Sequence, residues 1–197
     1  MNHLAHFHLA APGEGRIVGA LLADYVRGPL DGRLPAEVED GVRLHRRIDA
    51  VTDAHAAVRE LCGGFAPPAR RLAGIALDLY FDLFLTRHWQ RFHAQDLDSF
   101  GRGIYAVLRA HRALFPEAGR RHAERLEQYD LLRRYADSAV VEGALERIGE
   151  RLGMPVQMQA AIFAARAQLP AIERGFLALY PELVVLARSF SAGSGSS

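Results

Sequence analysis

The sequence contains no lysine, so all 24 of its basic residues are arginines. A GC-rich coding bias is the simplest explanation of this choice. The chemical consequence stands regardless, because the planar guanidinium binds carboxylates and phosphates through paired hydrogen bonds. Acidic residues number 23 and the formal net charge is +1, so the overall charge does not indicate a polyanionic partner.

Cysteine occurs only once, at Cys62, which excludes an internal disulfide and favours a reducing compartment. No apolar run reaches the roughly 20 residues that a membrane-spanning helix requires. The N-terminus lacks the basic segment and apolar run of a signal peptide, so we expect a cytoplasmic protein. The small, polar ending SAGSGSS (191–197) is expected to be disordered or a remnant of cloning, outside a single domain of residues 1–190.

Apolar residues recur at helical spacing along most of the 197-residue chain, and the alternation typical of strands is rare. The pattern predicts an all-α, single-domain helical bundle of about seven helices. The longest are expected at residues 16–26, 35–61 and 68–92. The last of these is apolar nearly all round and should be central. Pro170 and Pro181 are expected to divide the C-terminal segment.

Two carboxylates in the most hydrophobic predicted helix give the sharpest functional signal. Asp78 and Asp82 lie one turn apart in DLYFDLFLTRHW. Without partners they would repel each other and lose solvation. A divalent cation or an arginine partner would remove both costs, so the pair indicates a functional cluster.

The segment LHRRIDAVTD places several charged residues on one helix. His45 and Asp49 are four residues apart, as are Asp49 and Asp53, and such pairs share a helix face. The arrangement suits a shared cation, or a carboxylate that orients a ligating imidazole. Arg46 and Arg47 point elsewhere and suit a phosphate. A solvated face held by local ion pairs is the alternative interpretation.

Two further segments hold candidate ligands. NHLAHFHL contains His3, His6 and His8, and imidazole is a common metal ligand, although surface histidines near a chain end are the simpler interpretation. Asp24 in GALLADYVRG lies near a helix C-terminus, where the helix dipole disfavours an acid. It either serves a site, or is simply an exposed acid, or pairs with Arg27.

Together these imidazoles and carboxylates fit Mn²⁺ or Mg²⁺, and the histidines favour Mn²⁺. Such an ion lowers the pKa of bound water and neutralises phosphoryl oxygens, which suits phosphoester hydrolysis. The sequence has no GxxxxGK[ST], GxGxxG or GxSxG motif, and Cys62 has no evident base beside it. No basic run with interleaved aromatics indicates nucleic acid binding.

Four ordered motifs, NHLAHFHL, GALLADYVRG, LHRRID followed by TD, and DLYFDLFLTRHW, resemble those of the bacterial acyl carrier protein phosphodiesterases. The resemblance extends to the glycine- and serine-rich tail. It is dense up to about residue 92 and thin beyond it, where LYPELV is the best remnant.

The resemblance implies hydrolysis of the phosphodiester between 4′-phosphopantetheine and the serine of holo-acyl carrier protein, which leaves the apo-carrier. It also implies Mn²⁺, with Mg²⁺ as the alternative, and an atypical helical relative of HD-domain phosphohydrolases. Water would attack phosphorus and the serine oxygen would leave. The carrier is a small acidic protein, and arginines on the surface could bind it. The alternative is that these arginines only form a solvated helix surface. The candidates are Arg70, Arg71, Arg120, Arg121, Arg125, Arg133 and Arg134.

Positions carried over from the family motifs give a candidate site. The implied metal ligands are His6, Asp24, His45, Asp78 and Asp82. The implied catalytic group is Asp24, His45, Asp49 and Arg46, in which Asp49 orients His45 while Asn2 and Arg46 contact the phosphate. The chain departs from the family pattern at Ala20, where asparagine is usual, and at Leu83, where histidine is usual.

Two alternative functions remain open from the sequence. One is an HD-like phosphohydrolase that acts on a nucleotide or another small phosphoester. The other is a non-catalytic protein that binds acyl carrier protein.

Overall fold

In a computed structural model of the chain, every regular element within the described residues, 1–193, is a helix. Side chains are described as far as residue 190. The α-helices are α1 (His3–Ala10), α2 (Glu14–Leu22), α3 (Ala36–Ala54), α4 (Ala56–Gly63), α5 (Ala73–Arg87), α6 (Trp89–Phe92), α7 (Leu97–Ala110), α8 (Glu117–Gln128), α9 (Leu131–Arg134), α10 (Ser138–Arg151), α11 (Pro155–Ala167) and α12 (Leu169–Gly193), with 3₁₀ turns at Ala69–Leu72 and Arg112–Leu114.

The all-α prediction is confirmed, whereas the predicted number of seven helices is too low for the described residues. The helix expected at 35–61 is interrupted at His55, whose backbone is extended. The helix expected at 68–92 begins as a 3₁₀ turn and is interrupted at His88. Periodicity did not reveal these breaks, because the apolar spacing continues across them.

The prediction that Pro181 divides the C-terminal segment is wrong, since α12 runs through it. A proline removes one intrahelical hydrogen bond, but Phe176, Tyr180 and Leu183 on either side of it are fully buried and hold the helix against the core. The helical backbone also extends through residues 191–193 of the expected tail. Residues 194–197 of that tail lie outside the described residues. No helix in the described part of the chain is long and apolar enough to cross a membrane.

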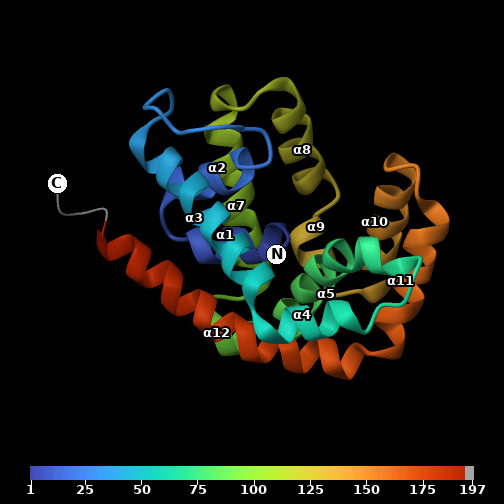
Figure 1. Cartoon of the computed structure of the whole chain (residues 1–197). Coiled ribbons are helices and arrows are strands. Elements are labelled where there is room, and N and C mark those ends of the chain that lie inside the picture. The colour runs from blue at the N-terminus through green and yellow to red at the C-terminus, as the bar shows by residue number, and fades with distance from the viewer. Residues whose placement is uncertain (194–197) are drawn as a thin grey trace.

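Helix α1 lies at the centre of the molecule, in contact with α2, α3, α5 and α12 (Figure 1). Every residue from Leu4 to Ala10 is buried, including its histidines His6 and His8. Helix α5 is buried along most of its length, as its apolar sequence predicts. The core therefore encloses α1, and any polar group on that helix must find its partners inside the protein.

Helices α2 and α3 cross at a pair of glycines. A Cβ atom on Gly19 would lie 2.2 Å from the Val38 carbonyl oxygen, and one on Gly41 would lie 2.4 Å from the Arg16 carbonyl oxygen. Neither distance is compatible with a side chain, so the two backbones approach as closely as only glycine allows. This approach places the backbone of α2 within hydrogen-bonding reach of the side chains on α3.

Candidate metal centre and adjoining cleft

Three predicted site residues, His6, His45 and Asp49, converge between α1 and α3. One possible ligand atom from each lies within 4.8 Å of the others. The two imidazole rings stack with centroids 3.7 Å apart and an angle of 4° between their planes. Asp49 spans both rings, with Oδ1 3.1 Å from Nε2 of His6 and Oδ2 3.1 Å from Nε2 of His45.

The tautomer of His45 follows from its partner on α2. Its Nδ1 lies 2.8 Å from the Ala20 carbonyl oxygen, which can only accept, so Nδ1 carries the proton. With Nδ1 occupied in this way, the second ring nitrogen, Nε2, is the one that faces a carboxylate oxygen of Asp49. Two acceptors face each other favourably only when a proton or a metal ion lies between them. A backbone carbonyl that fixes the far nitrogen is also the usual arrangement behind a ligating histidine.

His6 is the second imidazole and is only 3% exposed. Its Nε2 lies 3.1 Å from Oδ1 of Asp49 without the geometry of a hydrogen bond, and its Nδ1 has no hydrogen-bond partner within the described structure, although buried polar atoms are nearly always paired. Burial lowers the pKa of His6 to about 3, against the opposing effect of Asp49, so the ring is neutral at neutral pH. A cation between Nε2 and Oδ1 of Asp49 would satisfy a nitrogen that otherwise makes no hydrogen bond, and the three residues therefore fit a metal ion.

The Met1 ammonium is buried beside this group. It lies 2.8 Å from Oδ1 of Asp78 and 3.6 Å from Oδ1 of Asp49. Burial lowers the pKa of the amine, but Asp78 and Asp49 more than offset that effect and raise it. The carboxylates at this position therefore stabilise a buried positive charge.

Asp82 has different partners from those expected of a metal ligand. Its oxygens accept the backbone N–H groups of Leu4 and Ala5 at 2.9 and 3.1 Å. Asn2 makes no side-chain capping bond, so Asp82 caps the first turn of α1 from α5, where the helix dipole favours an acid. Burial raises the pKa of Asp82 to about 7, although both backbone bonds oppose the shift. Capping thus accounts for an acid in an apolar helix without an ion or an arginine.

Asp24 and Arg46 also lie outside the group of His6, His45 and Asp49. Asp24 belongs to a second group, with His3 and His122. Among the described residues no ion pair joins it to Arg27. Arg46 donates to the carbonyl oxygens of Val26 and Gly28 at 2.8 and 2.9 Å, which fastens the loop after α2. The five ligands implied by the family motifs are therefore not gathered around one point.

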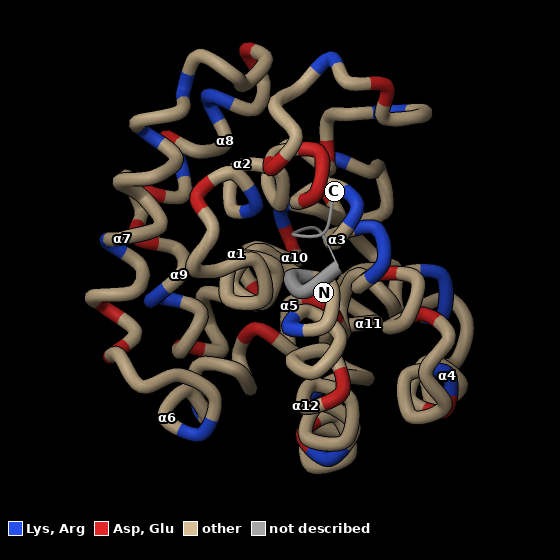
Figure 2. Tube along the Cα trace, turned by 90° about the vertical axis from the view of Figure 1, so that its left-hand side faces the viewer, with Lys and Arg blue, Asp and Glu red and all other residues tan. Residues whose placement is uncertain are grey.

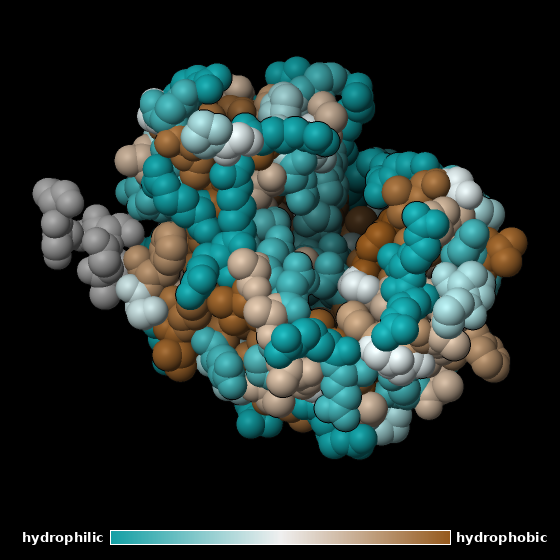
Figure 3. Space-filling model, in the orientation of Figure 1, coloured by the Kyte–Doolittle hydropathy of each residue, from teal (hydrophilic) through white to brown (hydrophobic). Residues whose placement is uncertain are grey.

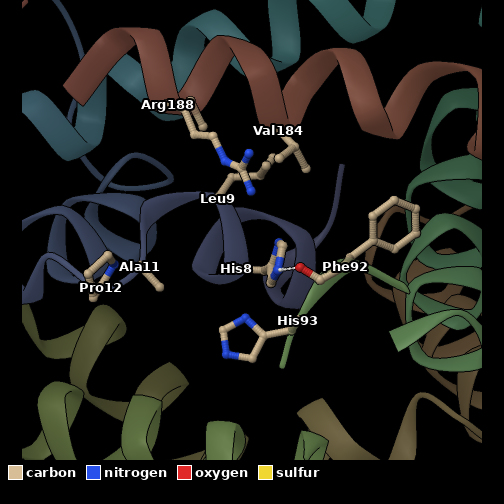
Figure 4. A pocket seen from close by; sticks show the side chains of 9 residues that line it. His8, Leu9, Ala11, Pro12, Phe92, His93, Val184 and Arg188 are labelled. Carbon is tan, nitrogen blue, oxygen red and sulfur yellow. Dashed lines mark hydrogen bonds between the residues drawn. The ribbon is translucent and has the colours of Figure 1, made fainter. Parts of the chain in front are cut away.

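His8 is a core residue whose two ring nitrogens both make hydrogen bonds. Nδ1 lies 2.8 Å from the hydroxyl of Tyr180, and Nε2 lies 3.3 Å from the carbonyl oxygen of Phe92. Figure 4 shows the imidazole pointing toward that carbonyl, beside His93 and below Arg188 of α12. The simpler interpretation, that these histidines lie on the surface, does not hold for His6 or His8.

A cleft of about 480 Å³ opens next to the second group. Asn2, His3 and His122 line it, and Figure 3 shows the surface hollowed between α8 and α10. A neighbouring hollow of about 680 Å³ shares Arg125 and Arg147 with it, so the two form one groove. We call it the arginine groove; its basic lining residues are Arg121, Arg125, Arg134, Arg147 and Arg151.

The arginines of the chain differ in whether they are already paired. Acidic and basic positions are interspersed along the helices in Figure 2, and many of them form local ion pairs. Arg120 and Arg121 pair with Glu117, and Arg133 pairs with Asp130. Within the described residues, four groove arginines have no carboxylate partner: Arg125, Arg134, Arg147 and Arg151.

Comparison with known proteins identifies the family of the chain. The family model described as acyl carrier protein phosphodiesterase matches residues 1–183. The chain belongs to the acyl carrier protein phosphodiesterase family. A relative of that name from Klebsiella pneumoniae subsp. pneumoniae is 34% identical over 194 residues, 96% of this chain and 98% of the relative. Another, from Yersinia pestis, is 31% identical over 185 residues, 93% and 96% of the two chains.

A third relative of the same name, from Photorhabdus laumondii, is 35% identical over 152 residues, 77% of each chain. No solved structure matches the chain. The sequence predicts that this acyl carrier protein phosphodiesterase family member resembles the HD-domain phosphohydrolases in fold. That likeness stays a prediction.

Several residues that line the cleft of this phosphodiesterase family member lie outside the sequence motifs. His122 is one of them, and it lies on the same face of α8 as the buried residues Gly119 and Leu126. Arg147 and Arg151 of α10 are others, because nothing local in a sequence distinguishes an arginine on a groove from one on an open surface. Of the other candidate arginines, Arg70 lines a separate hollow beside Cys62.

Proposed function

We propose that this protein is a metal-dependent phosphodiesterase that removes 4′-phosphopantetheine from the serine of holo-acyl carrier protein and leaves the apo-carrier. Family membership and the names of its relatives support the reaction. The structural observation that most supports it is the convergence of His6, His45 and Asp49, in which Nε2 of each imidazole lies 3.1 Å from a carboxylate oxygen of Asp49. The Nδ1 of His45 is bound by the Ala20 carbonyl and the ring nitrogens of His6 make no hydrogen bond, so the group suits a divalent cation.

The proposed ion is Mn²⁺, with Mg²⁺ as the alternative, since two imidazoles and a carboxylate favour the softer cation. The proposed ligands are His6, His45 and Asp49. Asp78 is linked to this group by the Met1 ammonium, which contacts both Asp78 and Asp49. When bound, such an ion supplies a water of lowered pKa and neutralises charge on the phosphoryl oxygens.

The protein's own residues prepare the site for this chemistry. The Ala20 carbonyl keeps His45 in the tautomer whose Nε2 is free. Asp82 fixes the first turn of α1 and so fixes the position of His6 on that helix. In the hydrolysis, water adds to phosphorus and the serine oxygen leaves with a proton, which gives the apo-carrier and free 4′-phosphopantetheine.

The arginine groove is the proposed binding surface for the acidic carrier protein and its phosphorylated arm. Four of its arginines lack a carboxylate partner within the described residues, so their charges are available to an acidic surface. Guanidinium groups bind phosphate through paired hydrogen bonds. A charged groove of this kind also accelerates the encounter with an oppositely charged protein. With such a substrate, the protein would act in the cytoplasm and its role would be in fatty acid biosynthesis.

Product analysis separates this proposal from its rivals. Purified protein with Mn²⁺ is incubated with holo-acyl carrier protein and, separately, with a panel of nucleotides. We expect apo-carrier and free 4′-phosphopantetheine, with nucleotides left intact. Cleavage of nucleotides alone would favour a small-phosphoester hydrolase, and tight carrier binding without any cleavage would favour a binding protein.

A further inference from the structure

A second group of possible metal ligands lies beside the first. His3, Asp24 and His122 each present one such atom within 4.8 Å of the others. They come from α1, from the turn after α2 and from α8, so only the tertiary fold brings them together. The rings of His3 and His122 meet edge-on, with centroids 4.5 Å apart and an angle of 76° between them.

No hydrogen bond or ion pair among the described residues joins Asp24 to either imidazole, and none links Asp24 to an arginine. The three residues therefore lie near one another without bonding directly. Ligands on one ion behave in this way, because each lies about 2.0–2.2 Å from the metal and opposite ligands are then about 4 Å apart. A structural ion pair would instead have closed to hydrogen-bonding distance.

A hydrogen bond fixes the orientation of His122. The hydroxyl of Tyr25 lies 2.8 Å from Nδ1 of His122, and 3.5 Å from the Ala118 carbonyl oxygen to which it can donate. Nδ1 is therefore engaged and Nε2 is the nitrogen that remains for a ligand. This resembles the relation between His45 and the Ala20 carbonyl, in which a protein group holds the far nitrogen of the ring.

The two groups are neighbours. His3 and His6 are one turn apart on α1, which places their Cβ atoms about 5–6 Å from each other. His3 and His122 also line the arginine groove, where a phosphoester would enter. Two cations side by side are the arrangement that stabilises both the attacking and the leaving oxygen of a phosphoryl displacement.

We infer that His3, Asp24 and His122 bind a second divalent first-row cation, so that each chain holds two ions next to the arginine groove. The role of this ion rests on the proposed function, but its binding does not. Tyr25 is a positioning residue for the site, since it acts through His122.

Metal stoichiometry tests this inference directly. The full chain is stripped of metal and titrated with Mn²⁺, and the free ion is measured by electron paramagnetic resonance. We expect two bound ions per chain in the wild type, and one in both His122→Ala and Asp24→Asn. His6→Ala should also retain one ion, held by the second group. Thermal melting followed by circular dichroism confirms that each variant is folded.

Tyr25→Phe provides a test that preserves every ligand. It should keep two ions per chain but weaken the second by tenfold or more, because Nδ1 of His122 loses the group that orients the ring. A wild type that binds only one ion, lost in His6→Ala and kept in His122→Ala, would overturn the inference. Two ions retained in both His122→Ala and Asp24→Asn would overturn it as well.

The same titration distinguishes failure of this inference from failure of the proposed function. Two ions in a protein that leaves holo-carrier uncut would support the second site and contradict the phosphodiesterase. One bound ion in a protein that cuts the carrier would support the phosphodiesterase and contradict the second metal site.

Discussion

His45 and Asp49 lie one turn apart on α3, and Nε2 of the imidazole faces Oδ2 of the carboxylate at 3.1 Å. Because Nδ1 of His45 is bound by the Ala20 carbonyl, a proton or a metal ion must lie between the two facing atoms. The motif LHRRID therefore builds a geometry that is compatible with a divalent cation.

Asp49→Asn should therefore weaken Mn²⁺ binding by at least 10–100-fold, the range found when groups that support metal ligands are removed. The amide has nearly the same shape as the carboxylate but carries no charge. Asp53→Asn is the matched control, since Asp53 is an exposed acid one turn further along α3. Equal affinities of the two variants in a calorimetric titration would contradict the assigned ligand.

Gly19→Ala should destabilise the protein by about 1–3 kcal/mol, the usual cost of overpacking. The added methyl group would lie 2.2 Å from the Val38 carbonyl oxygen and force α2 away from α3. Gly103→Ala, in α7 with nothing within 4 Å, should instead stabilise by about 0.5–1 kcal/mol because alanine favours the helix. Urea denaturation measures both. A neutral Gly19→Ala would show that the close crossing is not required.

Acid should destabilise the metal-free protein partly through His6. Its folded pKa of about 3 lies below the ordinary 6.5, so the unfolded chain binds the proton more readily. The stabilising contribution is complete above pH 6.5 and is lost as the pH falls toward 3. His6→Gln should flatten this part of the curve of unfolding free energy against pH. An unchanged slope in the variant would argue against burial of a neutral ring.

Asp82 should produce a pH dependence of the opposite sign. Its folded pKa of about 7 lies above the ordinary 3.8, so the folded protein holds the proton more tightly. The contribution is present below pH 3.8 and is lost as the pH rises toward 7. We expect Asp82→Asn to remove that loss of stability, as measured by denaturation at a series of pH values. A variant as pH-sensitive as the wild type would contradict this account.

Arg147→Glu should lower kcat/KM for holo-acyl carrier protein by about tenfold or more at low salt, because it reverses a charge that lines both hollows of the groove. The loss should shrink as salt rises and screens the interaction. Arg71→Glu is the control, an exposed arginine that does not line the groove. Equal effects of the two substitutions would indicate general electrostatics and no defined docking surface.

The sequence predicted the helical class, the central place of α5 and the pairing of His45 with Asp49, because these follow from local spacing. It did not predict the capping role of Asp82, since the backbone groups of Leu4 and Ala5 that it binds are nearly 80 residues away. For the same reason it did not predict that Asp24 and His45 belong to different groups of possible ligands, or that Asp24 lies close to His122. Those relations depend on how helices cross, which is decided at contacts such as Gly19 with Gly41.

The most direct test of the central claim is a mass spectrum of holo-acyl carrier protein after incubation with the protein and Mn²⁺. We expect the carrier to lose the mass of its 4′-phosphopantetheine arm with the wild type and to keep it with Asp49→Asn or after metal removal. A carrier left intact by the fully metallated wild type, or cut equally by metal-stripped protein, would contradict hydrolysis at a site built from His6, His45 and Asp49.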